Sequence, residues 1–290
     1  GGFILVNDGQ VELLVDHVEG SDIVCVCAND GIVKNKRGIN VPGIELGFDF
    51  VSERDRSDLE FGCEQDVNFI AASFVRRPQD VLDVKKILIE CGKPDIQIIA
   101  KIENSEGVEK IDDIIKVADG IMVARGDLGV EVPAEDVPLI QKEIIRKCNI
   151  AGKVVITATQ MLESMQENPR PTRAEVSDVA NAIYDGTDAI MLSGESAQGK
   201  YPEEAVLTMN KIAIKTESTL DYDSLHRKAV RTAFGDSSEA ICMSVAEIAT
   251  KFNVAAIIAY TESGFTAQKM SRYRPECPVI AATPRGETMR

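Results

Sequence analysis

The sequence predicts an α/β protein whose centre is a parallel β-sheet. From about Val67, short apolar runs rich in β-branched residues alternate with longer amphipathic segments, which is typical of βα units. The runs are apolar on both faces, as expected of parallel strands that helices cover on each side. They are Val67–Phe74, Ile96–Ile102, Gly120–Ala124, Val154–Thr159 and Ala189–Leu192.

Polar and charged residues follow these predicted strands at their carboxyl ends. They are Lys101 and Glu103, Arg125 to Asp127, Thr159 and Gln160, and Ser193 to Glu195. Ligands of parallel α/β folds bind at this edge of the sheet. Polar ends that converge fit a barrel better than an open sheet, but five units do not close a barrel of eight. Either the sheet is open, or three further units lie outside this chain.

The segment before these units is predicted to be β-rich. An apolar run at Ile4–Val6 is followed by strand patterns at Val11–Val15 and Ile23–Cys27. The turn residues Asn29-Asp30-Gly31 predict another hairpin-like element. A Pro42-Gly43 step ends this stretch.

The segment after the units is predicted to be a smaller α/β region. A long helix is expected from Tyr201-Pro202 to about Ser218. A helix, a strand, a helix and a strand then follow at Ser238–Lys251, Val254–Tyr260, Thr266–Tyr273 and Val279–Thr283.

The composition excludes several classes of protein. Lys plus Arg is 32 and Asp plus Glu is 47, so the net charge is −15, which argues against general binding of nucleic acid or anionic membranes. The longest apolar run, Val254–Tyr260, is too short to span a bilayer, and no secretory signal is expected at the start of the chain. The seven scattered cysteines fit neither a disulfide framework nor a zinc site, so we expect reduced thiols in a cytoplasmic protein.

Lys101 and Glu103 are candidates for phosphoryl chemistry. They lie two residues apart on a predicted strand, so their side chains share one face. A lysine neutralises phosphate oxygens, and a carboxylate beside it holds a divalent metal ion. The alternative is an ordinary Lys–Glu pair on the surface.

The next two strand ends offer further polar groups. Asp127 could supply a second oxygen ligand to the same ion, while the backbone N–H groups of Gly126 and Asp127 could hold a substrate carboxylate. Asp127 could instead cap a helix. The Thr159 hydroxyl could donate or relay a proton, or cap the following helix, and Ser193-Gly194-Glu195 is equally ambiguous.

Five blocks of sequence, in order, resemble the pyruvate kinase family. They are Ile98–Asn104 followed by Glu106-Gly107, Met122–Val130, Thr157–Met165, Pro169–Glu175 and Met191–Glu195. The resemblance covers essentially the whole chain. It implies a (β/α)8 TIM barrel, incomplete here, with the remnant of a β-rich lid domain and a C-terminal α/β domain. The implied domains are residues 1–43, 44–219 and 220–290.

The resemblance also implies an activity and a set of site residues. The reaction is phosphoryl transfer from phosphoenolpyruvate to ADP, giving pyruvate and ATP, the last step of glycolysis. Glu103 and Asp127 would bind Mg²⁺ or Mn²⁺, and Lys101 would stabilise the phosphoryl group and the enolate charge. Backbone groups of Gly126 and Asp127 would hold the substrate carboxylate. Thr159 would lie near the carbon that is protonated.

Further expectations from the resemblance concern assembly and regulation. The full-length form would be a cytoplasmic homotetramer with Arg173 near a barrel-to-barrel interface, and it would need K⁺. A possible effector loop, which grips the phosphate of a sugar in regulated members, is formed by Thr261, Ser263, Gly264 and Thr266. Glu262 places a negative charge in that loop, which argues against activation by a sugar bisphosphate.

This sequence departs from the family pattern in the parts that it lacks. The opening barrel strands, with a phosphate-binding arginine and the K⁺ ligands, the first half of the lid and the end of the C-terminal domain have no counterpart here. The chain by itself is therefore expected not to close a barrel or turn over efficiently. A catalytically incomplete fragment that only binds ligands or subunits is one alternative. A metal-dependent aldolase or lyase acting on a pyruvate enolate, without ADP, is a less favoured one.

Overall fold

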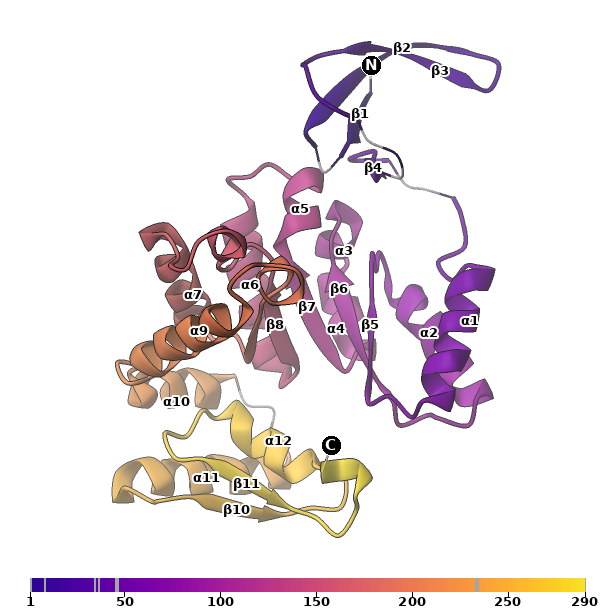
Figure 1. Cartoon of the computed structure of the whole chain (residues 1–290). Helices are drawn as coiled ribbons and strands as arrows, with labels where there is room; N and C mark the ends of the chain where they lie inside the picture. The colour runs from indigo at the N-terminus through magenta and orange to yellow at the C-terminus, as the bar shows by residue number, and fades with distance from the viewer. Residues whose placement is uncertain are drawn as a thin grey trace.

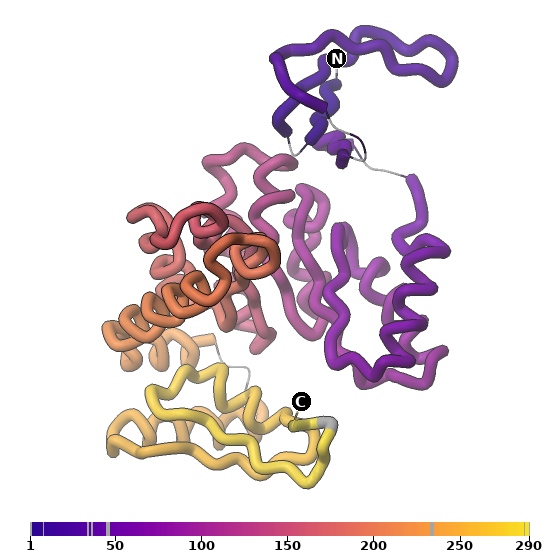
Figure 2. Tube along the Cα trace, in the orientation of Figure 1, coloured from indigo at the N-terminus to yellow at the C-terminus, as the bar shows by residue number. Residues whose placement is uncertain are grey.

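The computed structural model describes residues 2–289 except 8, 34, 36, 45, 46, 233 and 234. An antiparallel sheet at the N-terminus, a central parallel sheet with helices, and a smaller C-terminal α/β unit follow one another along the chain (Figure 1). The same order is seen in the trace, which runs from the indigo N-terminal sheet to the yellow C-terminal unit (Figure 2). The predicted α/β fold class is confirmed.

The central sheet has five parallel strands. They are β5 (Phe69–Ala72), β6 (Gln97–Ile102), β7 (Gly120–Ala124), β8 (Val154–Ala158) and β9 (Ala189–Met191). Each strand pairs with the next one in the sequence, and among the described residues β5 and β9 have a partner on one side only. All five predicted strands are confirmed, and the sheet that they form is open.

Helices connect these strands and cover the sheet. They are α1 (Glu53–Glu64), α2 (Pro78–Glu90), α3 (Ser105–Glu109), α4 (Ile111–Val117), α5 (Arg125–Glu131), α6 (Val137–Ala151), α7 (Arg173–Asp185), α8 (Gly194–Ala197) and α9 (Pro202–Glu217), with a 3-10 turn η1 at Glu163–Gln166. The predicted long helix corresponds to α9. Several starts follow from local sequence, since Pro78 and Pro202 occupy first-turn positions where a missing N–H costs nothing.

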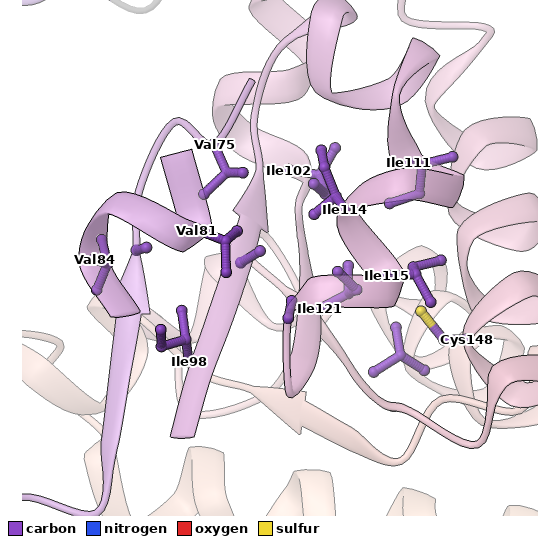
Figure 3. Close-up of a cluster of buried hydrophobic side chains, with 14 of the residues drawn as sticks. Val75, Val81, Val84, Ile98, Ile102, Ile111, Ile114, Ile115, Ile121 and Cys148 are labelled. Atoms are coloured by element: carbon purple, nitrogen blue, oxygen red, sulfur yellow. The ribbon is translucent and has the colours of Figure 1, made fainter. Parts of the chain in front are cut away.

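The hydrophobic core lies between these helices and one face of the sheet. Ile98 and Ile121 from the strands meet Val81 from α2 and Ile114 from α4 (Figure 3). Burying each side chain of this size stabilises the fold by about 1.5–3 kcal/mol. The other face carries a smaller buried cluster around Ile99, so adjacent residues of β6 are buried on opposite sides, as the apolar runs predict.

Aspartates and glycines lie at the turns that lead into the amino ends of the strands. The Asp119 carboxylate accepts the Ile98 N–H at 2.8 Å, and Asp188 accepts the Val155 N–H at 2.9 Å, so each ties its own strand to the preceding one. The helices that lead to this edge end at residues with left-handed φ: Gly92 at 72°, Gly152 at 67° and Gly186 at 98°. Glycine adopts this conformation without steric cost.

The N-terminal sheet consists of β1 (Phe3–Val6), β2 (Val11–Glu19), β3 (Asp22–Cys27) and β4 (Ile39–Asn40), in the order β3-β2-β1-β4 and all antiparallel. β2 continues past the predicted end at Val15, and the β2–β3 hairpin turns at Gly20. The further hairpin-like element predicted at Asn29-Asp30-Gly31 is not formed by the described residues, because β3 pairs with β2 alone. The Asn29 side chain bonds to the backbone of Gln10 and Glu12.

The C-terminal unit consists of α10 (Tyr222–Arg231), α11 (Ser237–Phe252), β10 (Ile257–Tyr260), α12 (Phe265–Arg272), β11 (Val279–Ala282) and a 3-10 turn η2 at Glu287–Met289. The two strands are parallel, and both predicted strands and both predicted helices are present with ends shifted by a few residues. This unit lies below the amino ends of the central strands (Figure 1), where the Arg274 guanidinium pairs with Asp188 at 2.7 Å.

The cysteines form no disulfide, and Cys63, Cys148 and Cys242 are buried. Burial raises the pKa of the Cys148 thiol to about 12, so this group stays protonated at neutral pH. No helix in the described part of the chain combines the length and apolar character needed to cross a membrane.

Candidate active site

The predicted site residues lie at the carboxyl ends of three neighbouring strands. Lys101 belongs to β6 and Glu103 follows it; Asp127 lies in α5, directly after β7; Thr159 follows β8. Since β6, β7 and β8 are adjacent and parallel, their ends share one edge of the sheet. The N-terminal sheet lies beyond this edge (Figure 1), and Asn40 donates to Glu131 of α5 at 3.0 Å.

Lys101 and Glu103 form a close pair at the end of β6. Lys101 Nζ lies 2.7 Å from Glu103 Oε1 and donates to Ser73 Oγ at 2.8 Å. Glu103 Oε2 accepts the Phe74 N–H at 2.5 Å, and the Glu103 side chain is only 1% exposed. Glu103 is therefore a buried carboxylate, and the alternative of an ordinary surface pair is wrong. Sequence reasoning missed Ser73 and Phe74, which follow β5 without any local signal.

Oε1 of Glu103 faces a cation of the chain itself. The Lys101 ammonium lies 2.7 Å from this buried oxygen, so a metal ion held by Glu103 would share the carboxylate with Lys101. The described residues contain no group of three or more His, Cys, Asp or Glu side chains arranged to hold a metal ion. Mg²⁺ usually takes one or two carboxylates together with water and substrate oxygens, so a site built on Glu103 and Asp127 fits it. Their role as ligands stays a prediction.

Asp127 lies at the third position of α5. The residue that caps this helix is Ala124, so the alternative in which Asp127 is the cap is wrong. An acidic side chain in the first turn is still favourable, because the N-terminus of a helix carries partial positive charge. The Gly126 N–H donates to Thr159 Oγ1 at 2.7 Å. A substrate carboxylate at this N–H would have to share it with the Thr159 hydroxyl.

Thr159 stands in a strained turn. Its φ is 71° and that of Gln160 is 54°, while Phe74 beside Glu103 has a φ of 56°. The left-handed region costs a residue other than glycine about 1–2 kcal/mol, and such strain gathers at functional sites. The Thr159 hydroxyl donates to the Ala158 carbonyl at 2.6 Å. The next helical turn, η1, is preceded by Leu162, so the alternative in which Thr159 caps it is wrong.

Glu195 stabilises the backbone at this edge of the sheet. Its side chain is fully buried, and its two oxygens accept the Leu162 N–H at 3.0 Å and the Ser193 N–H at 2.8 Å. It thereby joins the loops that follow β8 and β9. Burial, followed by the charge of Glu195, raises the pKa of the nearby Glu163 carboxyl.

A cavity of about 820 Å³ lies beside the site, along the open edge of β5. Its lining includes Ser73 and Phe74, the partners of Lys101 and Glu103, and reaches Ile39 and Asn40 of the N-terminal sheet. Lys101 and Glu103 themselves are not among its lining residues.

Comparison with known proteins decides the family. A family model described as pyruvate kinase, barrel domain, matches residues 1–206, and a second one, pyruvate kinase, alpha/beta domain, matches residues 239–290. This chain belongs to the pyruvate kinase family.

Curated relatives agree with that assignment. The chain is 57% identical to a pyruvate kinase of Clostridium perfringens, an alignment that covers 98% of this chain and 60% of the relative. It is 55% identical to one of Bacillus licheniformis, with 98% and 49% covered, and 53% identical to one of Staphylococcus aureus, with 100% and 50% covered. The chain thus spans between about half and three-fifths of the length of the curated relatives that it matches.

The possible effector loop of this pyruvate kinase chain connects β10 to α12. The Thr261 N–H donates to the Ala282 carbonyl at 3.0 Å, and Gly264 precedes α12 with a φ of 81°. The negative charge of Glu262 faces Arg285 at 3.4 Å, so a cation of the same loop region partly balances it. The loop belongs to the C-terminal unit, which lies below the amino ends of the central strands, whereas the predicted site residues lie at their carboxyl ends (Figure 1).

Arg173 is the first residue of α7 and is exposed. The start of this helix is held by Glu175, whose carboxylate accepts the Thr172 and Ser164 N–H groups at 2.7 Å each. Burial would raise the pKa of Glu175, but hydrogen bonds from Ser164 and Thr172 lower it overall. The predicted interface role of Arg173 stays a prediction.

Proposed function

We propose that this chain supplies the catalytic strand ends of a pyruvate kinase that acts on phosphoenolpyruvate and ADP. The bond between phosphorus and the enol oxygen breaks, and a β-phosphate oxygen of ADP bonds to the phosphorus to give ATP. The enolate left behind takes a proton on its methylene carbon and becomes pyruvate. The observation that carries the proposal is the buried Lys101–Glu103 pair at the carboxyl end of β6 in a chain of this family.

Each site residue has a role in this proposal. The Lys101 ammonium neutralises the phosphoryl oxygens and the charge that develops on the enol oxygen. Glu103 and Asp127 hold Mg²⁺ or Mn²⁺, which supplies positive charge for the phosphate oxygens when it is bound. The first turn of α5, at Gly126 and Asp127, receives the substrate carboxylate. Thr159 lies on the side of the substrate where the methylene carbon is protonated.

Assembly and regulation are proposed on family membership. The protein works in the cytoplasm as a homotetramer with Arg173 near a subunit interface, and K⁺ is its monovalent cofactor. Thr261, Ser263, Gly264 and Thr266 form the effector loop. The proposed domains are residues 1–43 for the partial lid, 44–219 for the partial barrel and 220–290 for the partial C-terminal domain. The net charge of −15 supports small-molecule ligands over nucleic acid or a membrane surface.

A second candidate is a fragment that binds ligands or subunits without turnover. The open edge of β5 favours it, because five strands alone do not close the barrel around the site. Nothing in the geometry favours an aldolase or lyase over a kinase.

The test is ATP formation from phosphoenolpyruvate and ADP with Mg²⁺ and K⁺. It is run on the 290-residue chain and on a chimera in which this chain replaces the matching segment of the Clostridium perfringens relative. We expect an active chimera and an inactive isolated chain. A folded chimera without activity would overturn the kinase proposal, and so would pyruvate formed together with inorganic phosphate in the absence of ADP, because water would then be the phosphoryl acceptor.

A further inference from the structure

The turn after β8 needs outside support to keep its conformation. β8 ends at Ala158, and Thr159 and Gln160 then both take positive φ, at 71° and 54°. Two consecutive residues other than glycine rarely adopt this region, and such a turn persists only when its surroundings determine it. The groups that hold Thr159 therefore decide where its hydroxyl lies.

The side chain of Arg125 holds the backbone of this turn. Its guanidinium donates to the Thr159 carbonyl at 2.7 Å and to the Ala158 carbonyl at 3.4 Å, and it contacts Met161 Sδ at 2.9 Å. Arg125 is only 10% exposed. A planar cation with several N–H donors suits a set of carbonyls on one corner better than a single ammonium would.

The guanidinium is itself fixed by side chains of two helices. Asp178 of α7 accepts with both carboxylate oxygens, at 2.8 and 2.7 Å, and Gln141 of α6 accepts at 3.3 Å. A two-point pairing of this kind fixes the plane of the guanidinium as well as its position. Arg125 thus connects the turn after β8 to helices α6 and α7.

The hydroxyl of Thr159 is held by the neighbour of Arg125. The Gly126 N–H donates to Thr159 Oγ1 at 2.7 Å, and this hydroxyl donates to the Ala158 carbonyl at 2.6 Å. Two adjacent residues of α5 therefore fix Thr159 from both sides, Arg125 at its carbonyl and Gly126 at its hydroxyl. The same turn of α5 carries Asp127, a proposed metal ligand.

We propose that Arg125 is a positioning residue that sets the place of the Thr159 hydroxyl for protonation of the enolate. This inference rests on the proposed function, in which Thr159 lies beside the carbon that is protonated. Protonation forms a C–H bond from the carbon–carbon π pair while the C–O bond becomes a carbonyl, and the Thr159 hydroxyl relays the proton from solvent. The reverse step passes a methyl proton back to solvent through the same hydroxyl. In D₂O the methyl group of pyruvate should therefore exchange hydrogen for deuterium, a step that consumes no nucleotide.

The exchange is measured by proton NMR on the chimera described above, with Mg²⁺, and compared with the KM for phosphoenolpyruvate. We expect Arg125→Lys to slow exchange by about 10- to 100-fold, the size of loss that a small misplacement of a reacting group causes. The KM should change by less than about 3-fold, since Arg125 is not placed on the substrate. Asp178→Asn, which frees the guanidinium without removing it, should give a smaller loss of the same kind.

Arg272→Lys is the matched control. Arg272 is also buried, at 7% exposed, pairs with the Glu239 carboxylate and donates to the Thr232 carbonyl at 2.9 Å, but it lies in the C-terminal unit. Loss of a buried guanidinium there should leave pyruvate exchange within about 2-fold. An equal loss in both variants would show a general effect on folding and would overturn the positioning role.

A double-mutant cycle separates positioning from structure. In Thr159→Val, which keeps the branched shape and removes the hydroxyl, adding Arg125→Lys should cost little further exchange, because Arg125 acts through that hydroxyl. Losses that multiply would overturn the inference.

Failure of the proposed function gives a different result. A chimera with neither ATP formation nor pyruvate exchange overturns the kinase proposal and with it the role of Thr159 in protonation. Hydrogen exchange of the Gly126 amide in the 290-residue chain then tests only whether Arg125 holds the Thr159 hydroxyl in place. Arg125→Lys should accelerate that exchange by at least about 10-fold, because Thr159 Oγ1 no longer stays in place to accept it. Unchanged protection of Gly126 would show that Arg125 does not position this hydroxyl, and loss of protection would show that it does.

Discussion

The amino and carboxyl edges of the central sheet differ in the residues that adopt left-handed backbone conformations. At the amino edge the chain turns left-handed mostly at glycines, namely Gly92, Gly152 and Gly186. Asp66 is the exception, and Asp is among the residues that tolerate this region best. At the carboxyl edge the left-handed residues are Phe74, Thr159 and Gln160. The amino edge is thus built at low conformational cost, while the carboxyl edge stores strain where the proposed chemistry lies.

The carboxylates at the two edges also differ in the groups that they bind. Asp119 and Asp188 each hold a backbone N–H of the neighbouring strand, and Asp188 uses its second oxygen for Arg274. Glu103 at the other edge accepts the Phe74 N–H with one oxygen and lies 2.7 Å from the Lys101 ammonium with the other. The carboxylate at the carboxyl edge is thus paired with a side chain of the proposed site, which the carboxylates of the amino edge are not.

Lys101→Met should give the largest loss. Without the ammonium, the phosphoryl oxygens and the enolate lose their fixed positive charge, and we expect ATP formation by the chimera to fall by about 10²- to 10³-fold. Lys93→Met is the control at the amino edge, where Lys93 pairs with the exposed Asp66 at 2.8 Å. It should leave turnover unchanged. Wild-type turnover in Lys101→Met would remove Lys101 from the mechanism.

Glu103→Gln should act on the metal requirement. The amide is a weaker ligand than the carboxylate, so the Mg²⁺ concentration for half-maximal activity of the chimera should rise by about 10- to 100-fold. Glu195→Gln is matched in burial, but both of its oxygens already accept backbone N–H groups. It should lower the melting temperature without moving the Mg²⁺ midpoint. An unchanged midpoint in Glu103→Gln would exclude Glu103 from the metal site.

Asp119→Ala should affect stability alone. It leaves the Ile98 N–H without its acceptor, which should lower the free energy of unfolding by about 1–2 kcal/mol in urea titrations. Asp119→Asn keeps an acceptor oxygen and should lose less than half of that. A fall in the turnover of the chimera, measured per folded molecule, would contradict the division between a structural and a functional edge.

Opposite substitutions at the two edges should change stability in opposite directions. A Cβ at Gly92 would meet no atom within 4 Å, so Gly92→Ala adds only the backbone cost and should destabilise by about 1 kcal/mol. Gln160→Gly, at an exposed position, removes that cost and should stabilise by about 0.5–1 kcal/mol. Thermal unfolding measures the melting temperature of each variant. Shifts of the same sign for Gly92→Ala and Gln160→Gly would refute the comparison of the two edges.

The bounds of a strand could be predicted where the buried segment and the run of apolar residues are the same. β7 has the predicted bounds because every one of its residues is buried, so the apolar run and the strand are the same segment. The predicted strand at Val154–Thr159 is one residue too long. Threonine favours strands, but tertiary contacts hold Thr159 in a left-handed conformation that ends the strand at Ala158. β2 was underestimated because Asp16 and His17 interrupt the apolar pattern on a surface strand.

The site could be predicted only where its residues are close in sequence. A spacing of two predicts that Lys101 and Glu103 share a face, and the structure pairs them. The contacts of Arg125 join it to Thr159, 34 positions away, and to Asp178, 53 positions away. No local pattern carries such information, because only the parallel stacking of successive βα units brings these residues together.

The strand order of the central sheet has a consequence for the way the chain folds. Because each strand from β5 to β9 pairs with its successor, every ladder closes a loop of a single βα unit, and the entropy lost in closing a loop rises with its length. The sheet can therefore grow one strand at a time as the polypeptide leaves the ribosome, each new unit docking on an edge that is already formed. Assembly along the sequence needs no distant partner until the first and last strands of a barrel must meet.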